Sequence, residues 1–185
     1  MLRAFLSSMI SRTERTWSYD ASYMREVLAV SPWTLLKFLP VMSLSRGRRA
    51  PREALAAAGV AATLAEDCGP CTQIGVDMAA AGGVPAPVLR AIVAGDEAAM
   101  GETARLGFQF ARSVLARDMI GADPLRDEIV RRWGKGALVD LAFAITTGRM
   151  YPTLKYALGH GRACSRVMVA GQPAVPRRQL ESQAA

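Results

Sequence analysis

The chain of 185 residues is long enough to form one domain with a substantial core. Apolar residues make up 51% of it and charged residues 21%, a balance that excludes an intrinsically disordered chain. Aromatic residues reach only 6% while alanine is abundant. Because alanine has the highest helix propensity and strands favour β-branched and aromatic residues, we expect an all-α fold.

The net charge of +7 is unevenly distributed along the chain. Residues 53–129 carry five basic and eleven acidic side chains, whereas the segments on either side are strongly basic. Such basic segments could meet nucleic acid or anionic lipid. The basic stretches within these segments show no interleaved aromatic residues and no nucleic-acid-binding motif, so we expect a solvated surface and no nucleic-acid partner.

Three cysteines do not make the dense, even set of a secreted disulfide scaffold. The first ten residues are apolar, but this stretch is short and carries Arg3, unlike a secretory signal. The most apolar stretch, residues 27–44, is interrupted by Pro32, Lys37 and Pro40. We therefore expect it to be a core helix with no membrane span, in a cytoplasmic protein.

Caps, prolines and apolar residues at helical spacing predict a succession of helices in chain order. In the first half of the chain we expect helices over residues 20–30, from Ser31-Pro32 onward, over residues 51–65, and from the cap Asp67 to Gly82-Gly83. In the second half we expect helices over residues 85–94, after the cap Asp96, and from Asp123-Pro124 to about Gly134. The last expected core helix contains Leu138 and Ile145. We expect residues 1–172 to form a single domain and residues 173–185 to form a loose tail.

Cys68 and Cys71 are the candidate catalytic residues. In the first turn of a helix, free N–H groups and the helix dipole favour the thiolate of Cys68. Cys68 would attack, and Cys71, one turn later, would resolve a mixed disulfide or sulfenic acid. This pattern predicts a thiol-based oxidoreductase that works through a reversible disulfide and needs no cofactor.

Two other interpretations of the pair remain open. A structural zinc site would need four ligands, and the chain offers only His160 and Cys164 as further good ones. Alternatively, both cysteines are small buried apolar residues. Cys-Gly-Pro-Cys is also the active-site tetrapeptide of thioredoxins, but no β-branched or alternating run precedes it here, so the thioredoxin fold is not expected.

The surroundings of the cysteine pair are more informative than the tetrapeptide. The segments that carry a resemblance are residues 64–71, the run Asp77-Met78-Ala79-Ala80-Ala81-Gly82-Gly83-Val84, residues 136–142 and residues 151–159. Together they resemble the carboxymuconolactone decarboxylase / alkylhydroperoxidase-D-like family over about residues 50–160. The resemblance implies an alkylhydroperoxidase-D-like helical bundle that assembles as a homo-oligomer, a trimer or hexamer. It also implies reduction of a small-molecule peroxide, or exchange with a thiol–disulfide partner.

The sequence departs from the peroxidatic members of that family in the proton relay. Those members carry one His four positions after the second cysteine and another just before it, where this chain has Gly75 and Pro70. A family Glu twelve positions before the first cysteine corresponds to Ala56. No lactone-site residue supports the decarboxylase activity.

Nearby acidic residues are substitute candidates for the relay, although a carboxylate beside a thiol opposes thiolate formation. These residues are Glu53, Glu66 and Asp67. The alternative function is a non-catalytic helical oligomer of the same fold that has lost the relay.

Overall fold

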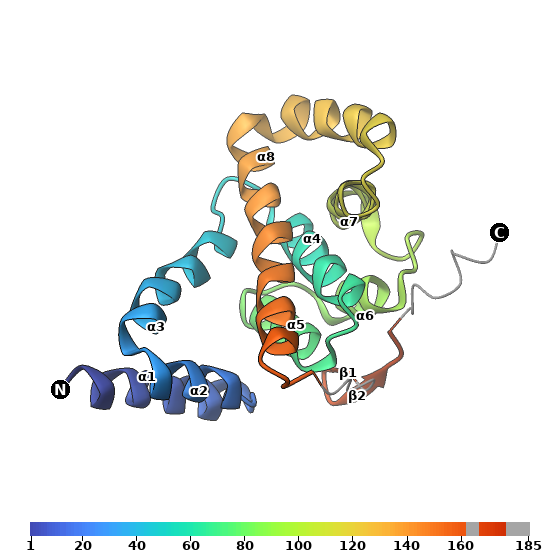
Figure 1. The fold of residues 1–185 in the computed structure, drawn as a ribbon. Helices are drawn as coiled ribbons and strands as arrows, with labels where there is room; N and C mark the ends of the chain where they lie inside the picture. The colour runs from blue at the N-terminus through green and yellow to red at the C-terminus, as the bar shows by residue number, and fades with distance from the viewer. Residues whose placement is uncertain (162–166, 177–185) are drawn as a thin grey trace.

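The computed structural model describes residues 1–161 and 167–176, which form eight α-helices, one 3-10 helix and a small hairpin (Figure 1). This confirms the all-α expectation. The elements in order are α1 Leu2–Trp17, α2 Ser22–Val30, α3 Pro32–Phe38, η1 Leu39–Ser45, α4 Arg52–Ala65, α5 Gly69–Ala81, α6 Ala86–Ala94, α7 Gly101–Leu115, α8 Met119–Ala157, β1 Val167–Val169 and β2 Gln172–Ala174. Among the described residues, no helix is long and apolar enough to cross a bilayer.

Helix α4 is the centre of the main core and packs against α5, α6, α7 and α8. Its alanines allow close approach of the neighbouring helices, and several of them are completely buried. The tightest contact is with α7, where a Cβ added at Gly107 would lie 2.5 Å from the carbonyl oxygen of Ala54. Small residues on both helices therefore set the distance between them.

Helix α8 turns a corner at Gly134, so that its two halves run in different directions (Figure 1). Gly134 has φ 82°, which interrupts the helix where the sequence predicted an end. The expected start at Asp123 is wrong. Asp118 caps the helix one turn earlier by accepting a hydrogen bond from the Gly121 N–H at 2.9 Å. Pro124 lies inside the helix and has no N–H to donate to the carbonyl of Ile120, four residues earlier. Because Ile120 is exposed, water can hydrogen-bond to this carbonyl.

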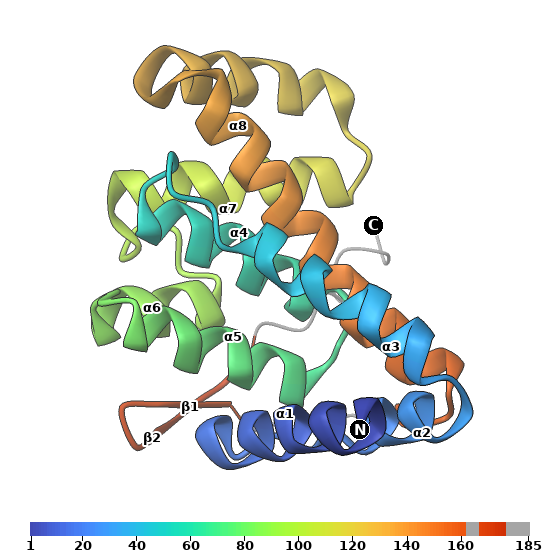
Figure 2. The ribbon, with the colours of Figure 1, turned by 90° about the vertical axis from the view of Figure 1, so that its left-hand side faces the viewer.

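Helices α1, α2 and α3 form a second, smaller apolar cluster at one end of the molecule (Figure 2). Residues 27–44 do not form one core helix, because this stretch is divided among α2, α3 and η1, and the first break falls at the expected helix start Ser31-Pro32. Ser31 accepts a hydrogen bond from the Thr34 N–H and starts α3, with Pro32 as its first residue. Leu35 is buried, whereas Val30 and Trp33 are exposed.

Residues 167–176 contain the hairpin β1–β2, in which Val167 pairs with Ala174. The side chain of Gln73 in α5 holds this hairpin. Its amide oxygen accepts a hydrogen bond from the Met168 N–H at 2.6 Å, and its amide nitrogen donates to the Met168 carbonyl at 3.1 Å. The strands therefore cover one side of α5.

Candidate active site

The two candidate cysteines meet at the start of α5. Cys68 itself is the N-cap residue, and Asp67, the expected cap, instead adopts a left-handed conformation with φ 49°. The Cys68 carbonyl accepts a hydrogen bond from the Thr72 N–H at 2.9 Å and so begins the helix. The Sγ atoms of Cys68 and Cys71 lie 2.7 Å apart, and both residues are buried with 4% of their surface exposed. A disulfide can form here without a large backbone movement.

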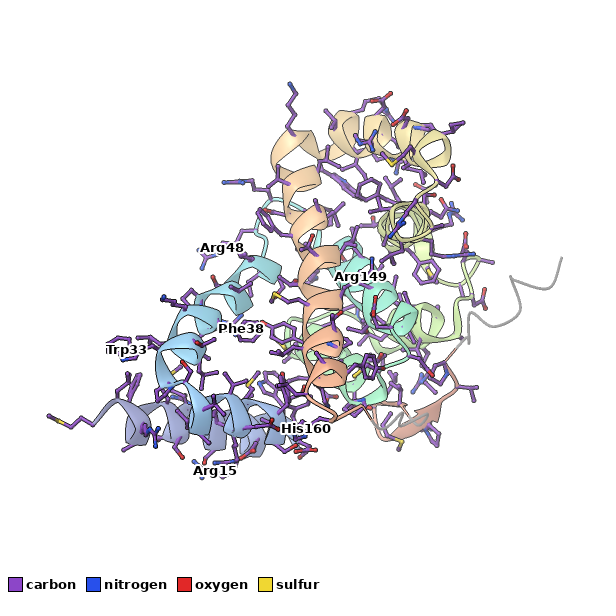
Figure 3. The ribbon with its side chains drawn as sticks, viewed as in Figure 1. Arg15, Trp33, Phe38, Arg48, Arg149 and His160 are labelled. Carbon is purple, nitrogen blue, oxygen red and sulfur yellow. The ribbon has the colours of Figure 1, made fainter. Side chains whose placement is uncertain are left out.

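The loop that leads to Cys68 is tied to α8 through Glu66. The Tyr156 hydroxyl donates to the Glu66 carbonyl, and the Arg149 guanidinium donates to the Glu66 carboxylate, each at 2.5 Å. Arg149, which belongs to α8, is labelled in Figure 3. Glu66 therefore fixes the turn in front of the pair, and the carboxylate is neutralised rather than free to relay protons.

The two thiols have opposite acidities. A hydrogen bond from the Cys71 S–H lowers the pKa of Cys68 to about 7, against the effect of burial. The Cys71 backbone N–H and the ammonium of Lys155 lower this pKa further, whereas Asp67 raises it. The same interaction raises the pKa of Cys71, and burial raises it further. Ionisation of the pair therefore begins at Cys68, while Cys71 keeps its proton.

Three side chains that sequence reasoning missed surround the pair: Tyr19, Tyr23 and Lys155. The Tyr19 hydroxyl lies 3.9 Å from Cys71 Sγ and 3.3 Å from the Tyr23 hydroxyl. Burial raises the pKa of both tyrosines above the ordinary value, so both stay protonated. Lys155 has only 4% of its surface exposed, and its Nζ lies 5.2 Å and 5.5 Å from the two ring centroids.

A signal for these residues exists in the sequence. Tyr19 and Tyr23 are four residues apart, and Lys155 is a lone cation between the apolar Leu154 and Leu158 of the last core helix. Neither pattern identifies a partner, because the tyrosines lie about fifty residues before the cysteines and Lys155 lies far after them. Tertiary packing alone brings the three together.

The positions at which the resemblance would place relay groups lie near the pair but carry no relay. Ala56 and Gly75 both line a cavity of about 350 Å³ whose wall includes Cys71. A Cβ at Gly75 would contact only the Val60 side chain, at 3.7 Å. Glu53, one substitute candidate, pairs with Arg52 at 3.4 Å instead. The space at these two positions is therefore open, and the hydroxyl that contacts the pair is that of Tyr19, which lines the same cavity.

The proposed metal ligands are arranged differently. His160 lies at the end of α8, where its Nδ1 is 3.1 Å from the Ser22 hydroxyl and its Nε2 is 2.7 Å from the Glu26 carboxylate (Figure 3). Cys164 lies outside the described residues. Within residues 1–161 and 167–176, no three His, Cys, Asp or Glu side chains come together as a metal site would require.

Comparison with protein-family models, with curated proteins and with solved structures found no match to this chain.

Proposed function

We propose that the chain is a thiol-based oxidoreductase that cycles Cys68 and Cys71 between dithiol and disulfide. The observation that carries this proposal is the contact of the two sulfurs at 2.7 Å at a helix start, with the pKa of Cys68 lowered to about 7. A thiol with this pKa is about half ionised at neutral pH, and the thiolate is the reactive form. A buried lysine beside two protonated tyrosines supports the same assignment, because it stabilises the anion.

The oxidant that fits this chemistry is a hydroperoxide. The Cys68 thiolate attacks one peroxide oxygen, the O–O bond breaks, and the leaving alkoxide takes up a proton to become an alcohol. Cys68 is then a sulfenic acid. The Cys71 thiol attacks its sulfur, water leaves, and the disulfide closes. Two thiols have supplied the two electrons that reduce the peroxide, and an external dithiol would return them.

Stoichiometry tests this proposal. Reduced protein is mixed with cumene hydroperoxide, and peroxide loss and free thiols are measured together. We expect one peroxide consumed and two thiols lost per chain, with a Cys68–Cys71 disulfide in the peptide map. Cys164→Ser is the matched control, since it removes a thiol outside the pair and should keep the reaction. Cys68→Ser should abolish disulfide closure. An intact thiol count after exposure would instead favour the non-catalytic oligomer.

Self-association is the second part of the proposal. Large apolar side chains of the N-terminal helices are exposed to solvent, including Val30 at 81% and Trp33 at 66% exposure. Figure 3 shows Trp33 on the outer side of these helices. A groove of about 690 Å³ between α3 and α8 also has mainly apolar walls, among them Phe38 and Ile145. A second copy of the chain would cover such surfaces. Light scattering should give a trimer or hexamer, and a monomer at micromolar concentration would contradict this.

A further inference from the structure

The cavity behind Cys71 has a shape and lining that the dithiol chemistry alone does not require. It has a volume of about 350 Å³ and lies between α4, α5, α8, the start of α2 and the loop before α4. Apolar side chains such as Val60, Ile74 and Met78 form most of its wall. Two helical glycines widen it, because a Cβ at Gly59 would meet nothing within 4 Å and one at Gly75 would meet only Val60. Cavities of this size and character commonly hold small ligands.

One polar group in the cavity wall has no partner. The Tyr151 hydroxyl is buried, and within the part of the chain that the structure describes it makes no hydrogen bond. An unpaired buried hydroxyl costs free energy, and an acceptor reached by a small shift of the side chain would remove that cost. The Tyr151 ring is held in place by an edge-to-face contact with Phe38 at 5.4 Å. Tyr151 therefore contributes to the cavity wall, and its hydroxyl is an unpaired donor buried just behind that wall.

A cation shares the cavity wall with Tyr151. Arg46 belongs to the cavity wall, and its charge acts on Tyr151, whose pKa burial raises and Arg46 lowers. No carboxylate among the described residues forms an ion pair with Arg46. The loop that carries Arg46 is anchored to α8, since the Asp140 carboxylate accepts hydrogen bonds from the Arg49 N–H at 2.7 Å and the Ala50 N–H at 3.3 Å. A guanidinium beside a hydroxyl donor matches a carboxylate.

We propose that this cavity binds a small apolar carboxylate, with the carboxylate against Arg46 and the Tyr151 hydroxyl and the apolar chain along α4 and α5 beside Cys71. At about 30 Å³ per non-hydrogen atom, the volume accommodates on the order of ten such atoms. The substrate class of the dithiol would then be a hydroperoxide that carries such a carboxylate, and in this respect the inference rests on the proposed function. Binding itself needs no thiol chemistry and can be measured separately.

Calorimetric titration of the reduced protein with octanoate tests the inference, with octanol as the uncharged ligand of the same length. We expect saturable binding of octanoate, and at least about tenfold weaker binding of octanol, because the charge-assisted hydrogen bonds are lost. Arg46→Ala and Tyr151→Phe should each weaken octanoate binding about tenfold. Gly75→Leu should abolish it, since the new side chain would occupy the cavity.

Arg48→Ala is the matched control, because it removes a neighbouring exposed cation of the same loop that does not line the cavity (Figure 3). Its octanoate affinity should equal that of the unmodified protein. Equal affinity for octanol and octanoate, unchanged binding in both Arg46→Ala and Tyr151→Phe, or no saturable binding would each overturn the inference. If octanoate binds but no disulfide closes, only the proposed oxidoreductase function is refuted. If the disulfide closes but octanoate does not bind, only the proposed carboxylate site is refuted.

Discussion

Removal of the Cys71 thiol tests the electrostatics of the pair most directly. The S–H of Cys71 is the largest contribution that lowers the pKa of Cys68 from its ordinary value of 9.0 to about 7. In Cys71→Ala this donor is absent while Cys68 stays buried, so we expect its pKa to return to about 9.0 or above. Cys71→Ser is the matched control, because the serine hydroxyl still donates a hydrogen bond and should keep the pKa well below that of the alanine variant.

The size of the kinetic effect follows from two opposing factors. At pH 7 the thiolate fraction of Cys68 falls from about one half to about one hundredth when the pKa rises by two units. A more basic thiolate is also a better nucleophile, and a Brønsted coefficient of about 0.45 returns about eightfold over two units. Alkylation of Cys68 at pH 7 should therefore slow about sixfold in Cys71→Ala.

The assay is the pH dependence of iodoacetamide alkylation, followed by mass spectrometry in a Cys164→Ser background. In the unmodified pair Cys68 should be alkylated before Cys71. If Cys71 reacts first, or if Cys68 keeps a pKa near 7 in Cys71→Ala, then the hydrogen bond between the sulfurs does not set the acidity. The backbone N–H of residue 71 and Lys155 would then be the remaining sources.

Three further outcomes are expected. Lys155→Met removes the buried cation and should raise the pKa of Cys68 in the same alkylation assay, while near-native far-ultraviolet circular dichroism shows that the fold persists. Gly107→Ala drives a Cβ into the α4 backbone and should cost about 1–3 kcal/mol in urea unfolding, whereas Gly59→Ala, with open space around it, should gain about 0.5–1 kcal/mol. The reduced protein should be most stable near pH 9, a maximum absent from the disulfide form. Between about pH 7 and pH 9.0 the folded pair binds one proton fewer than the unfolded chain, so stability rises with pH. Above pH 9.0 the folded pair binds one proton more, because Cys71 keeps its proton, so stability falls.

The helical class and the placement of the cysteine pair could be predicted because both depend on local patterns. Alanine content, proline positions and the spacing of Cys68 and Cys71 act within a few residues of one another. The helix start shows where this reasoning fails. Asp67 and Asp123 both have the residue type of a cap, but Cys68 and Asp118 occupy the cap positions. The backbone conformation of the preceding segment decides which of several suitable residues begins a helix. This conformation depends on tertiary packing.

The polar surroundings of the pair could not be predicted for a different reason. Tyr19 lies in the segment between α1 and α2, and Lys155 lies near the end of α8. No short-range sequence pattern connects either residue with Cys71. The sequence could show only that imidazoles are missing at Gly75 and Pro70. It could not show that the protonated Tyr19 hydroxyl contacts Cys71 or that the buried Lys155 packs on the Tyr19 ring.

This replacement has a consequence for the pH dependence of the chemistry. The chain has one histidine, and both ring nitrogens of His160 contact Ser22 and Glu26. The tyrosines beside the pair stay protonated at neutral pH, since burial raises the pKa of Tyr19 and of Tyr23. Cys68 is therefore the group of the pair that titrates near neutrality, and the peroxide reaction should rise with pH through a single ionisation at about 7. A bell-shaped profile with a second ionisation between pH 7 and 9 would show that a general acid titrates there, and would refute a mechanism in which the tyrosines stay protonated and Cys68 alone titrates.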